Sequence, residues 1–345
     1  MHVTTKLIAE LAGVSRGTVD RALNARGGVN REVAEKVIRI ANELGYKPNI
    51  VAKSLSNRGK GNTKIGVIIN SIGNPFYNDV MKGIYEAQTE IKDFGFEVEI
   101  IKLRGYEEKD QVKAIEKLLG NKVAGIIISP INTEMVISKL KSVIEDGIPV
   151  VAVNSDIEKV DRLAYIGCDY HKSGRTAGGI LGLFTGGNAK VGLVIGSPFV
   201  LGHRQRAQGF YQVIEQEFKG ISIIGEVQNN DSEEISYQVV KKFLEENPEV
   251  NALYFTTGGV KGGMKAVREL KKQDDLHIVT CDLTPVVEEN IRKGIIDATI
   301  CQQPFRQGFG SVKLLFDYLI ANEKPSKDVI HTEIEIKLKY NLSDE

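Results

Sequence analysis

The chain has 345 residues, of which 42% are hydrophobic, a length sufficient for about two packed domains. No N-terminal run is apolar enough for a signal peptide, and no stretch approaches the roughly 20 apolar residues that a membrane-spanning helix needs. Cys168, Cys281 and Cys301 are far apart and lack CxxC spacing, which argues against a disulfide framework or a zinc site. These features predict a cytoplasmic protein with reduced thiols.

The formal net charge is zero, but charge is unevenly divided along the chain. Residues 1–64 hold 12 Lys and Arg against 5 Asp and Glu, whereas residues 65–345 hold 33 against 40. A basic N-terminal segment ahead of an acidic remainder is typical of a protein that places only one end on a polyanion. Chance asymmetry in a short segment is the alternative, so charge supports this interpretation without deciding it.

Residues 5–24, TKLIAELAGVSRGTVDRALN, are predicted to form two short helices joined by one tight turn. The small Ala9 permits a close helix crossing, Gly13 can take the positive φ that the turn requires, and Val19 fills the interface between the helices. Each of these residues is common in helical hairpins. Their joint spacing within a basic segment favours a helix-turn-helix that reads DNA.

A third helix is predicted within REVAEKVIRIANELGYKP, with Asn30 as its N-cap and Gly45 and Pro48 as its end. Its apolar positions on one face are Val33, Val37, Ile40, Ala41 and Leu44. The three helices form a predicted head over residues 1–48. Residues 49–63 follow as a polar hinge, whose short apolar face needs a packing partner to become ordered.

From Lys64 onward, apolar runs typical of buried strands alternate with segments of helical periodicity. The runs cover residues 65–69, 98–103, 124–129, 149–154, 190–196, 221–227, 252–257, 277–282 and 298–302. Helices are expected between most of them, for example over 77–94 and 204–218. This alternation predicts an α/β fold over 64–345 with two lobes, each a parallel sheet of about five strands covered by helices on both faces.

Polar residues gather at the carboxyl ends of these runs, where open parallel sheets bind their ligands. The candidates are Asn70, Asn74, Ser129, Asn154, Ser155, Asp156, Thr256, Thr257, Asp282 and Gln302, with Phe76 and Tyr77 as an aromatic pair. Each alone is explained as a turn former or a helix N-cap. Together they favour a polyhydroxylated ligand, because amides and carboxylates bind vicinal hydroxyls and aromatic rings cover the C–H faces of a sugar.

Several strings resemble the LacI/GalR family of bacterial transcription regulators over essentially the whole chain. The N-terminal strings are LIAELAGVSRGTVDRALN, NELGYKPN, and VAKSLS followed by KIGVII. The later strings NPFY, SPIN, IPVVAVN, YIGCDYHKSG, RQRAQGF, CDLTP and ATICQQP are similar to the type I periplasmic sugar-binding fold, with a ribose-binding-like pocket pattern. The resemblance implies a homodimeric repressor that binds a pseudo-palindromic operator, with residues 64–345 as the effector-binding and dimerisation domain.

For the head, the resemblance implies that the helix from Arg16 to Leu23 enters the major groove of double-stranded DNA. The implied DNA contacts are Thr5, Ser15, Arg16, Gly17, Thr18, Arg21, Asn24 and Leu55, the last as the leucine that the family wedges into the minor groove. Gly17 departs from the larger base-reading side chains of the family. Asp20 either accepts a hydrogen bond from cytosine or, as we prefer, pairs with a nearby basic residue.

For the cleft, the resemblance implies effector contacts from both lobes. They are Asn70, Asn74, Phe76, Tyr77, Ser129, Asn154, Arg206, Thr257, Asp282 and Gln302. Arg206 and Asp282 are expected to make the strongest hydrogen bonds because they are charged. Asn154 and Ser155 stand where pentose binders have Asp and Arg, which argues against ribose, and Asp156 or Asp169 is the candidate that restores a carboxylate.

Two other classes of function compete with an effector-controlled regulator. A non-catalytic sugar-binding protein without a DNA role would need an export signal and no basic head. An enzyme is disfavoured because the glycine-rich residues 256–265 lack a phosphate-loop pattern, and because the five histidines show neither metal spacing nor a catalytic order. Residues 256–265 are expected to be a strand-to-helix turn. His203 either lines the mouth of the cleft or, as we prefer, is a solvated surface residue. No metal or cofactor is implied.

Overall fold

The computed structural model describes residues 4–23, 27–44, 62–70 and 72–343. The chain divides into two compact units, one with Met1–Gly61 and Asp317–Lys324, the other with Asn62–Phe316 and Pro325–Glu345. Because residues 45–61 lie outside the described part, the boundaries of a head over 1–48, a hinge over 49–63 and a ligand domain over 64–345 stay predictions.

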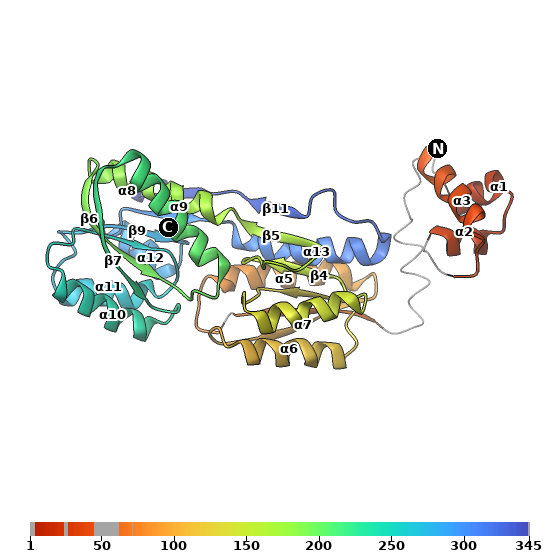
Figure 1. The fold of residues 1–345 in the computed structure, drawn as a ribbon, viewed down its shortest axis with the longest axis horizontal. Coiled ribbons are helices and arrows are strands. Elements are labelled where there is room, and N and C mark those ends of the chain that lie inside the picture. Colours follow the sequence, from red (N-terminus) through yellow and green to blue (C-terminus); the bar gives the residue numbers. More distant parts are fainter. Residues whose placement is uncertain (1–3, 24–26, 45–61, 71, 344–345) are drawn as a thin grey trace. The chain divides into compact units, whose positions relative to one another are not determined.

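The head consists of three helices around one apolar cluster (Figure 1). They are α1 (Thr5–Ala12), α2 (Arg16–Leu23) and α3 (Arg31–Glu43). Gly13 ends α1 in the left-handed region with φ 72°, and the side chains of Ala9 and Val19 are buried between the helices. The predicted helix-turn-helix is therefore confirmed at the residues that suggested it.

Polar caps set where the head helices begin. The Ser15 hydroxyl accepts a hydrogen bond of 3.1 Å from the Thr18 N–H, and the Asn30 side chain accepts one of 2.9 Å from the Glu32 N–H. Lys36 Nζ donates to the Ala12 carbonyl at 2.9 Å, which ties α3 to the end of α1. The predicted stop signals Gly45 and Pro48, and the apolar face of the hinge, lie outside the described residues.

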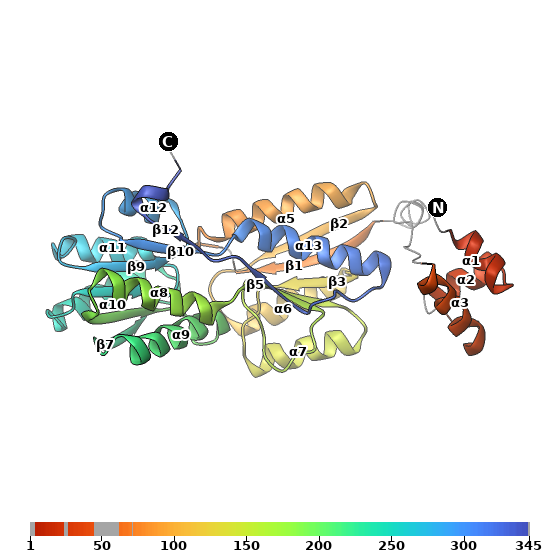
Figure 2. The same cartoon turned by 90° about the horizontal axis from the view of Figure 1, so that it is seen from above.

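The first lobe of the second unit is built on a six-stranded parallel sheet of order β11-β5-β4-β3-β1-β2 (Figures 1 and 2). Its strands are β1 (Thr63–Ile69), β2 (Phe96–Lys102), β3 (Gly125–Ile128), β4 (Val150–Val153), β5 (Ala164–Cys168) and β11 (Val329–Thr332). The helices are α5 (Tyr77–Lys92), α6 (Glu108–Gly120), α7 (Glu134–Glu145) and α13 (Pro304–Ala321). Helices α6 and α7 cover one face and α5 and α13 the other, so every residue of β3 and β4 is buried.

The second lobe has a six-stranded sheet of order β12-β10-β9-β8-β6-β7. Its strands are β6 (Asn188–Ile195), β7 (Gly220–Gln228), β8 (Ala252–Phe255), β9 (His277–Cys281), β10 (Ala298–Cys301) and β12 (Glu335–Lys337). The helices are α8 (Tyr170–Phe184), α9 (Leu201–Glu217), α10 (Glu233–Glu246), α11 (Val260–Glu269) and α12 (Pro285–Arg292), with a short 3-10 turn at Lys339–Asn341. Helices α8 and α9 pack in one apolar cluster and α10 to α12 in another, one on each face of the sheet.

The chain passes between the two lobes after β5, after β10 and between β11 and β12. The backbone carbonyl of Gln302 links the crossing after β10 to the one after β11, because it accepts hydrogen bonds of 2.8 Å from Gln307 Nε2 and from Thr332 Oγ1. The carboxyl ends of the strands in both sheets therefore meet near these crossings, which is where a ligand site is expected.

All nine predicted strands are present. Of the glycine-rich residues 256–265, residues 256–259 form the expected turn between β8 and α11, and residues 260–265 are already part of α11. Three strands were not predicted: β5, β11 and β12. Strand β12 is antiparallel to β10, so the second-lobe sheet is parallel except at this edge. Strands β11 and β12 are short and have no fully buried residue, which leaves them without the apolar run that marks the other strands.

Helices α8 and α9 cross at glycines. A Cβ added at Gly174 would lie 2.0 Å from the Arg206 carbonyl oxygen, and one added at Gly209 would lie 2.0 Å from the His171 carbonyl oxygen. Both clashes are with backbone atoms and cannot be relieved by a side-chain rotation. The two glycines therefore set the distance between the helices and, with it, the position of Arg206.

We expect Gly174→Ala to lower the free energy of unfolding of the ligand domain by about 1–3 kcal/mol, since the added methyl group overpacks the crossing. Gly179→Ala on the same helix is the matched control, because a Cβ there meets no atom within 4 Å. This control should gain about 0.5–1 kcal/mol from the better helix former. Denaturant unfolding measures both, and equal stability of the two variants would contradict the role of Gly174.

Candidate functional site

In the head, α2 presents Arg16, Gly17 and Arg21 on its exposed surface. Thr5 is half-buried, and the hydroxyls of Ser15 and Thr18 are hydrogen-bonded to each other at 2.9 Å. Asn24 and Leu55 lie outside the described residues. The exposed arginines agree with an approach to a polyanion, while the individual DNA contacts stay predictions.

In the second unit, a cavity of about 640 Å³, part of it open to solvent, lies where strands of both sheets end. Eight predicted ligand residues line it: Asn74, Phe76, Tyr77, Asn154, Arg206, Thr257, Asp282 and Gln302. Sequence reasoning therefore brought together residues that are separated by more than 200 positions in the chain.

Arg206 projects from α9 and is the central cation of the cavity. Its side chain is 4% exposed, its Nη1 donates to the Thr256 carbonyl at 2.8 Å, and its guanidinium lies 4.6 Å from the centre of the Tyr170 ring. Its Nε and Nη2 have no hydrogen-bond partner among the described residues. Because an arginine carries only donors, these two groups call for acceptor oxygens on a ligand.

Asp282 follows β9 with φ 68°, a conformation that costs energy for a residue with a side chain. Its carboxylate accepts hydrogen bonds of 3.1 and 3.0 Å from Gln302 Nε2 and lies 3.9 Å from Arg206 Nη2. Burial raises the pKa of Asp282 to about 6, although the charge of Arg206 opposes this shift. A donor group on a ligand would stabilise the ionised form.

On the first-lobe side, Tyr77 donates to Asn154 Oδ1 at 3.1 Å and its hydroxyl is hydrogen-bonded to Ser129 Oγ at 3.2 Å. The Phe76 and Tyr77 rings meet edge to face, with centroids 5.1 Å apart. Asn154 Nδ2 in turn donates to the Tyr170 hydroxyl at 2.8 Å. Ser129 therefore fixes the Tyr77 hydroxyl without lining the cavity. Hydrogen bonds to Ser129 and Asn154 thus hold the Tyr77 ring against Phe76.

Three predicted ligand residues are not part of the lining: Asn70, Ser129 and Asp156. Asn70 borders a neighbouring cavity, and its Nδ2 lies 3.4 Å from the Ser129 carbonyl. The carboxylate of Asp156 is bound at 2.5 and 2.6 Å by Nε and Nη2 of Arg162, a side chain that is only 10% exposed. Asp156 therefore does not replace the carboxylate that pentose binders have at position 154, because its own carboxylate pairs with Arg162.

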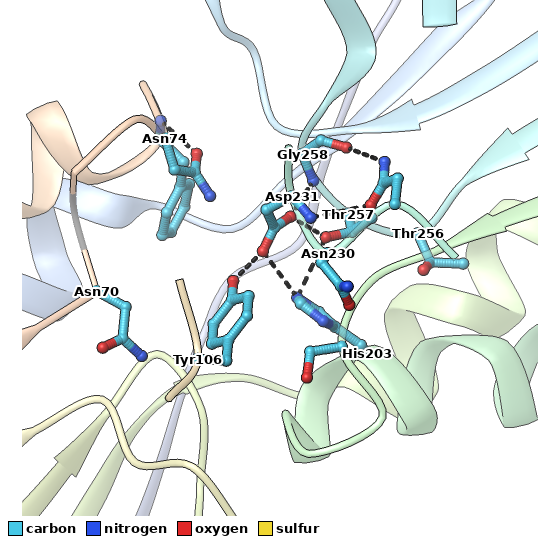
Figure 3. Close-up of polar contacts among 12 residues, drawn as sticks. Asn70, Asn74, Tyr106, His203, Asn230, Asp231, Thr256, Thr257 and Gly258 are labelled. Atoms are coloured by element: carbon cyan, nitrogen blue, oxygen red, sulfur yellow. Dashed lines mark hydrogen bonds and ion pairs between the residues drawn. The ribbon is translucent and has the colours of Figure 1, made fainter. Parts of the chain in front are cut away.

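Sequence reasoning missed a second aspartate of the cavity lining, Asp231 (Figure 3). The hydroxyls of Tyr106 and Thr257 donate to it, and the Gly258 N–H donates at 2.6 Å. Tyr106 belongs to the first lobe and the other residues to the second, so this carboxylate joins the two lobes. Asp231 follows β7 within QNND, and the rule applied to the other strand ends, extended to this one, would have found it.

The expectation that His203 is a solvated surface residue is wrong. Its side chain is 12% exposed, lines the cavity and places Nε2 3.7 Å from Asp231 Oδ2. Burial and the nearby Arg206 lower the pKa of His203 to about 3. The imidazole is therefore neutral at physiological pH and contributes no positive charge to the cavity.

Comparisons with known proteins match both units. Residues 4–49 match the bacterial regulatory proteins of the lacI family, and residues 65–324 match the periplasmic binding protein domain. The chain belongs to the lacI family of bacterial regulatory proteins, with a periplasmic-binding-protein-like ligand domain. It is a DNA-binding transcriptional regulator.

Relatives cover nearly all of the chain. The "Ribose operon repressor" of Halalkalibacterium halodurans is 27% identical over 353 residues, which cover 97% of this chain and 95% of that protein. The "HTH-type transcriptional regulator DegA" of Bacillus subtilis is 28% identical over 84% of each chain. The glucose-galactose binding protein GanP of Geobacillus stearothermophilus superimposes with a TM-score of 0.76 and 26% identity over 82% of this chain and 99% of that one.

No helix among the described residues is long and apolar enough to cross a membrane. Within the same residues, no group of three or more His, Cys, Asp or Glu side chains is placed to hold a metal ion. The cavity lining offers hydrogen-bond donors, acceptors and aromatic rings.

Asp156→Ala should lower the free energy of unfolding by about 2 kcal/mol, because Arg162 would keep its buried charge and lose two short hydrogen bonds. Affinity for a ligand of the cavity should be unchanged. Glu134→Ala is the control: it breaks an ion pair with Lys159 in which both side chains are more than half exposed, so stability should hardly change. A loss of ligand affinity in Asp156→Ala would return Asp156 to the binding site.

Proposed function

We propose that the protein is a repressor whose affinity for a pseudo-palindromic DNA operator is set by a sugar or polyol bound in the cavity between its lobes. The observation that carries this proposal is the combination, in one chain, of a helix-turn-helix head with a cavity where Arg206 and Asp282 converge. A non-catalytic sugar-binding protein without a DNA role is the alternative, and the head argues against it. We also propose a cytoplasmic location, because a protein that binds operator DNA must share its compartment.

The polar groups of the cavity support a polyhydroxylated effector. The free Nε and Nη2 of Arg206 offer donors, while the carboxylate of Asp282 offers acceptors on the same side of the cavity. A sugar hydroxyl is both donor and acceptor, so neighbouring hydroxyls satisfy both charged groups at once. The edge-to-face pair of Phe76 and Tyr77 supplies an apolar surface for the C–H groups of a ring.

The effector acts only if it binds one arrangement of the lobes better than another. A tenfold change in operator affinity needs about 1.4 kcal/mol of coupling between the two sites. Helix-turn-helix proteins read two half-sites with a twofold dimer, so we propose a homodimer. The proposed DNA contacts are those of α2 with Ser15 and Thr5, and of Asn24 and Leu55 beyond the described residues.

Arg21→Ala should weaken operator binding and lower the slope of log affinity against log salt by about 1, because one phosphate contact is lost. Arg39→Ala on α3 removes the same charge from another exposed position and should cost less. Fluorescence anisotropy with an operator duplex at several salt concentrations measures both. Unchanged affinity in Arg21→Ala would remove this residue from the interface.

Asp282→Ala should weaken effector binding by about 10- to 100-fold, the equivalent of one or two charge-assisted hydrogen bonds of about 1.5–3 kcal/mol. Operator binding without effector should persist. A thermal-shift screen of pentoses, hexoses and inositols on the wild-type protein identifies a ligand, and calorimetry compares the variant. A normal thermal shift in Asp282→Ala would mean that the effector binds elsewhere.

A further inference from the structure

The cavity carries more negative than positive charge. Its lining contains Asp231, Glu233 and Asp282, against Arg206 as the one permanent cation, and no lysine. His203 is the other basic residue of the lining and is neutral, as shown above. Since Arg206 lies 3.9 Å from Asp282, its charge is matched there. The basic group near Asp231 is the His203 imidazole, whose Nε2 lies 3.7 Å from Oδ2 and whose lowered pKa keeps it neutral, and no Lys or Arg pairs with Asp231 among the described residues.

The partners of Asp231 are all uncharged. Its Oδ1 accepts from the Thr257 hydroxyl and the Gly258 N–H, while its Oδ2 accepts from the Tyr106 hydroxyl. The side chain is 8% exposed, and burial raises its pKa. A carboxylate oxygen accepts more than one hydrogen bond, so Oδ2 keeps acceptor capacity for a further donor.

A buried carboxylate without a cation is costly, and a ligand cation relieves that cost. The carboxylates of Asp231 and Asp282 both line this cavity. An ammonium group carries three donors and no acceptor, which suits a space bordered by two carboxylates. A phosphate or carboxylate on the ligand would add a further anion to this cavity.

We propose that the effector is an amino sugar or amino polyol whose protonated amine binds at Asp231, on the Asp282 side of the cavity. This inference rests on the proposed function, because it names the class of the effector in the same cavity. Arg206 then donates hydrogen bonds to the hydroxyl oxygens of the ligand, and Asp231 binds the positively charged amine of the ligand. Tyr106 makes this selection depend on lobe closure, because its hydroxyl comes from the opposite lobe.

Matched sugars test the charge preference on the full-length wild-type protein. Calorimetry compares D-glucose with D-glucosamine and D-galactose with D-galactosamine, with N-acetyl-D-glucosamine, D-glucuronate and D-glucose 6-phosphate as neutral and anionic members. We expect at least one amine to bind about tenfold more tightly than its hydroxyl parent, since a charged hydrogen bond replaces a neutral one. The anionic members should bind more weakly than any neutral one.

Asp231→Asn assigns the preference to this carboxylate. It should weaken binding of the amine about tenfold and binding of the hydroxyl parent by less than about threefold, while Asp274→Asn, an exposed position in the turn before β9, changes neither. Neutral sugars that bind as tightly as their amines in the wild type overturn the inference and leave the proposed function standing. Failure of every sugar to bind overturns both. If Asp231→Asn does not fold, the comparison of amines with their hydroxyl parents on the wild-type protein still tests whether the cavity prefers a positive charge.

Discussion

The ligand domain depends on one buried charge, the guanidinium of Arg206. A cation at 4% exposure is stable only if other groups replace the water it has lost. The Tyr170 ring, the Thr256 carbonyl and the Asp282 carboxylate do so in part, each from a different element of the second lobe. Nε and Nη2 of Arg206 remain without hydrogen-bond partners among the described residues, so a ligand with acceptor oxygens can bind them. The same group thus organises the lobe and defines its ligand.

The packing of α8 on α9 determines where Arg206 lies. Arg206 reaches the carboxyl ends of the strands because its helix lies close to α8, and the glycines at positions 174 and 209 allow that approach. Tyr170, at the start of α8, then lies beneath the guanidinium, and its hydroxyl donates to Gln302 Oε1 at 2.9 Å. Backbone proximity, ring stacking and hydrogen bonding therefore depend on the same helix crossing. A local change at this crossing alters the ligand site without touching a ligand.

The sequence predicted most of the fold because its strands are buried β-branched runs and its head is marked by Ala9, Gly13 and Val19. It located the cavity because parallel strands deliver their polar ends to one edge. Prediction from the sequence failed where the position of a residue after a strand does not reveal which way its side chain points. Asp156 and Asp231 both follow predicted strands within a few residues, yet one turns toward Arg162 and the other toward Tyr106. Only tertiary packing distinguishes two such carboxylates.

Several hydrogen bonds join the lobes, among them the Asn132 N–H to the Phe199 carbonyl at 2.7 Å and Arg204 to Glu158 at 3.5 Å. Two further routes involve residues of the cavity, and they differ in what lobe opening does to them. One runs from Tyr77 through Asn154, Tyr170 and Gln302 to Asp282, close to the points where the chain itself crosses. The other is the contact of Tyr106 with Asp231, residues 125 positions apart with no chain crossing beside them. Rotation about the crossings would preserve the first route and break the second. Of these two cavity routes, the one at Asp231 therefore depends on closure. A ligand group also binds there in our proposal, and this gives the effector a means to favour one lobe arrangement.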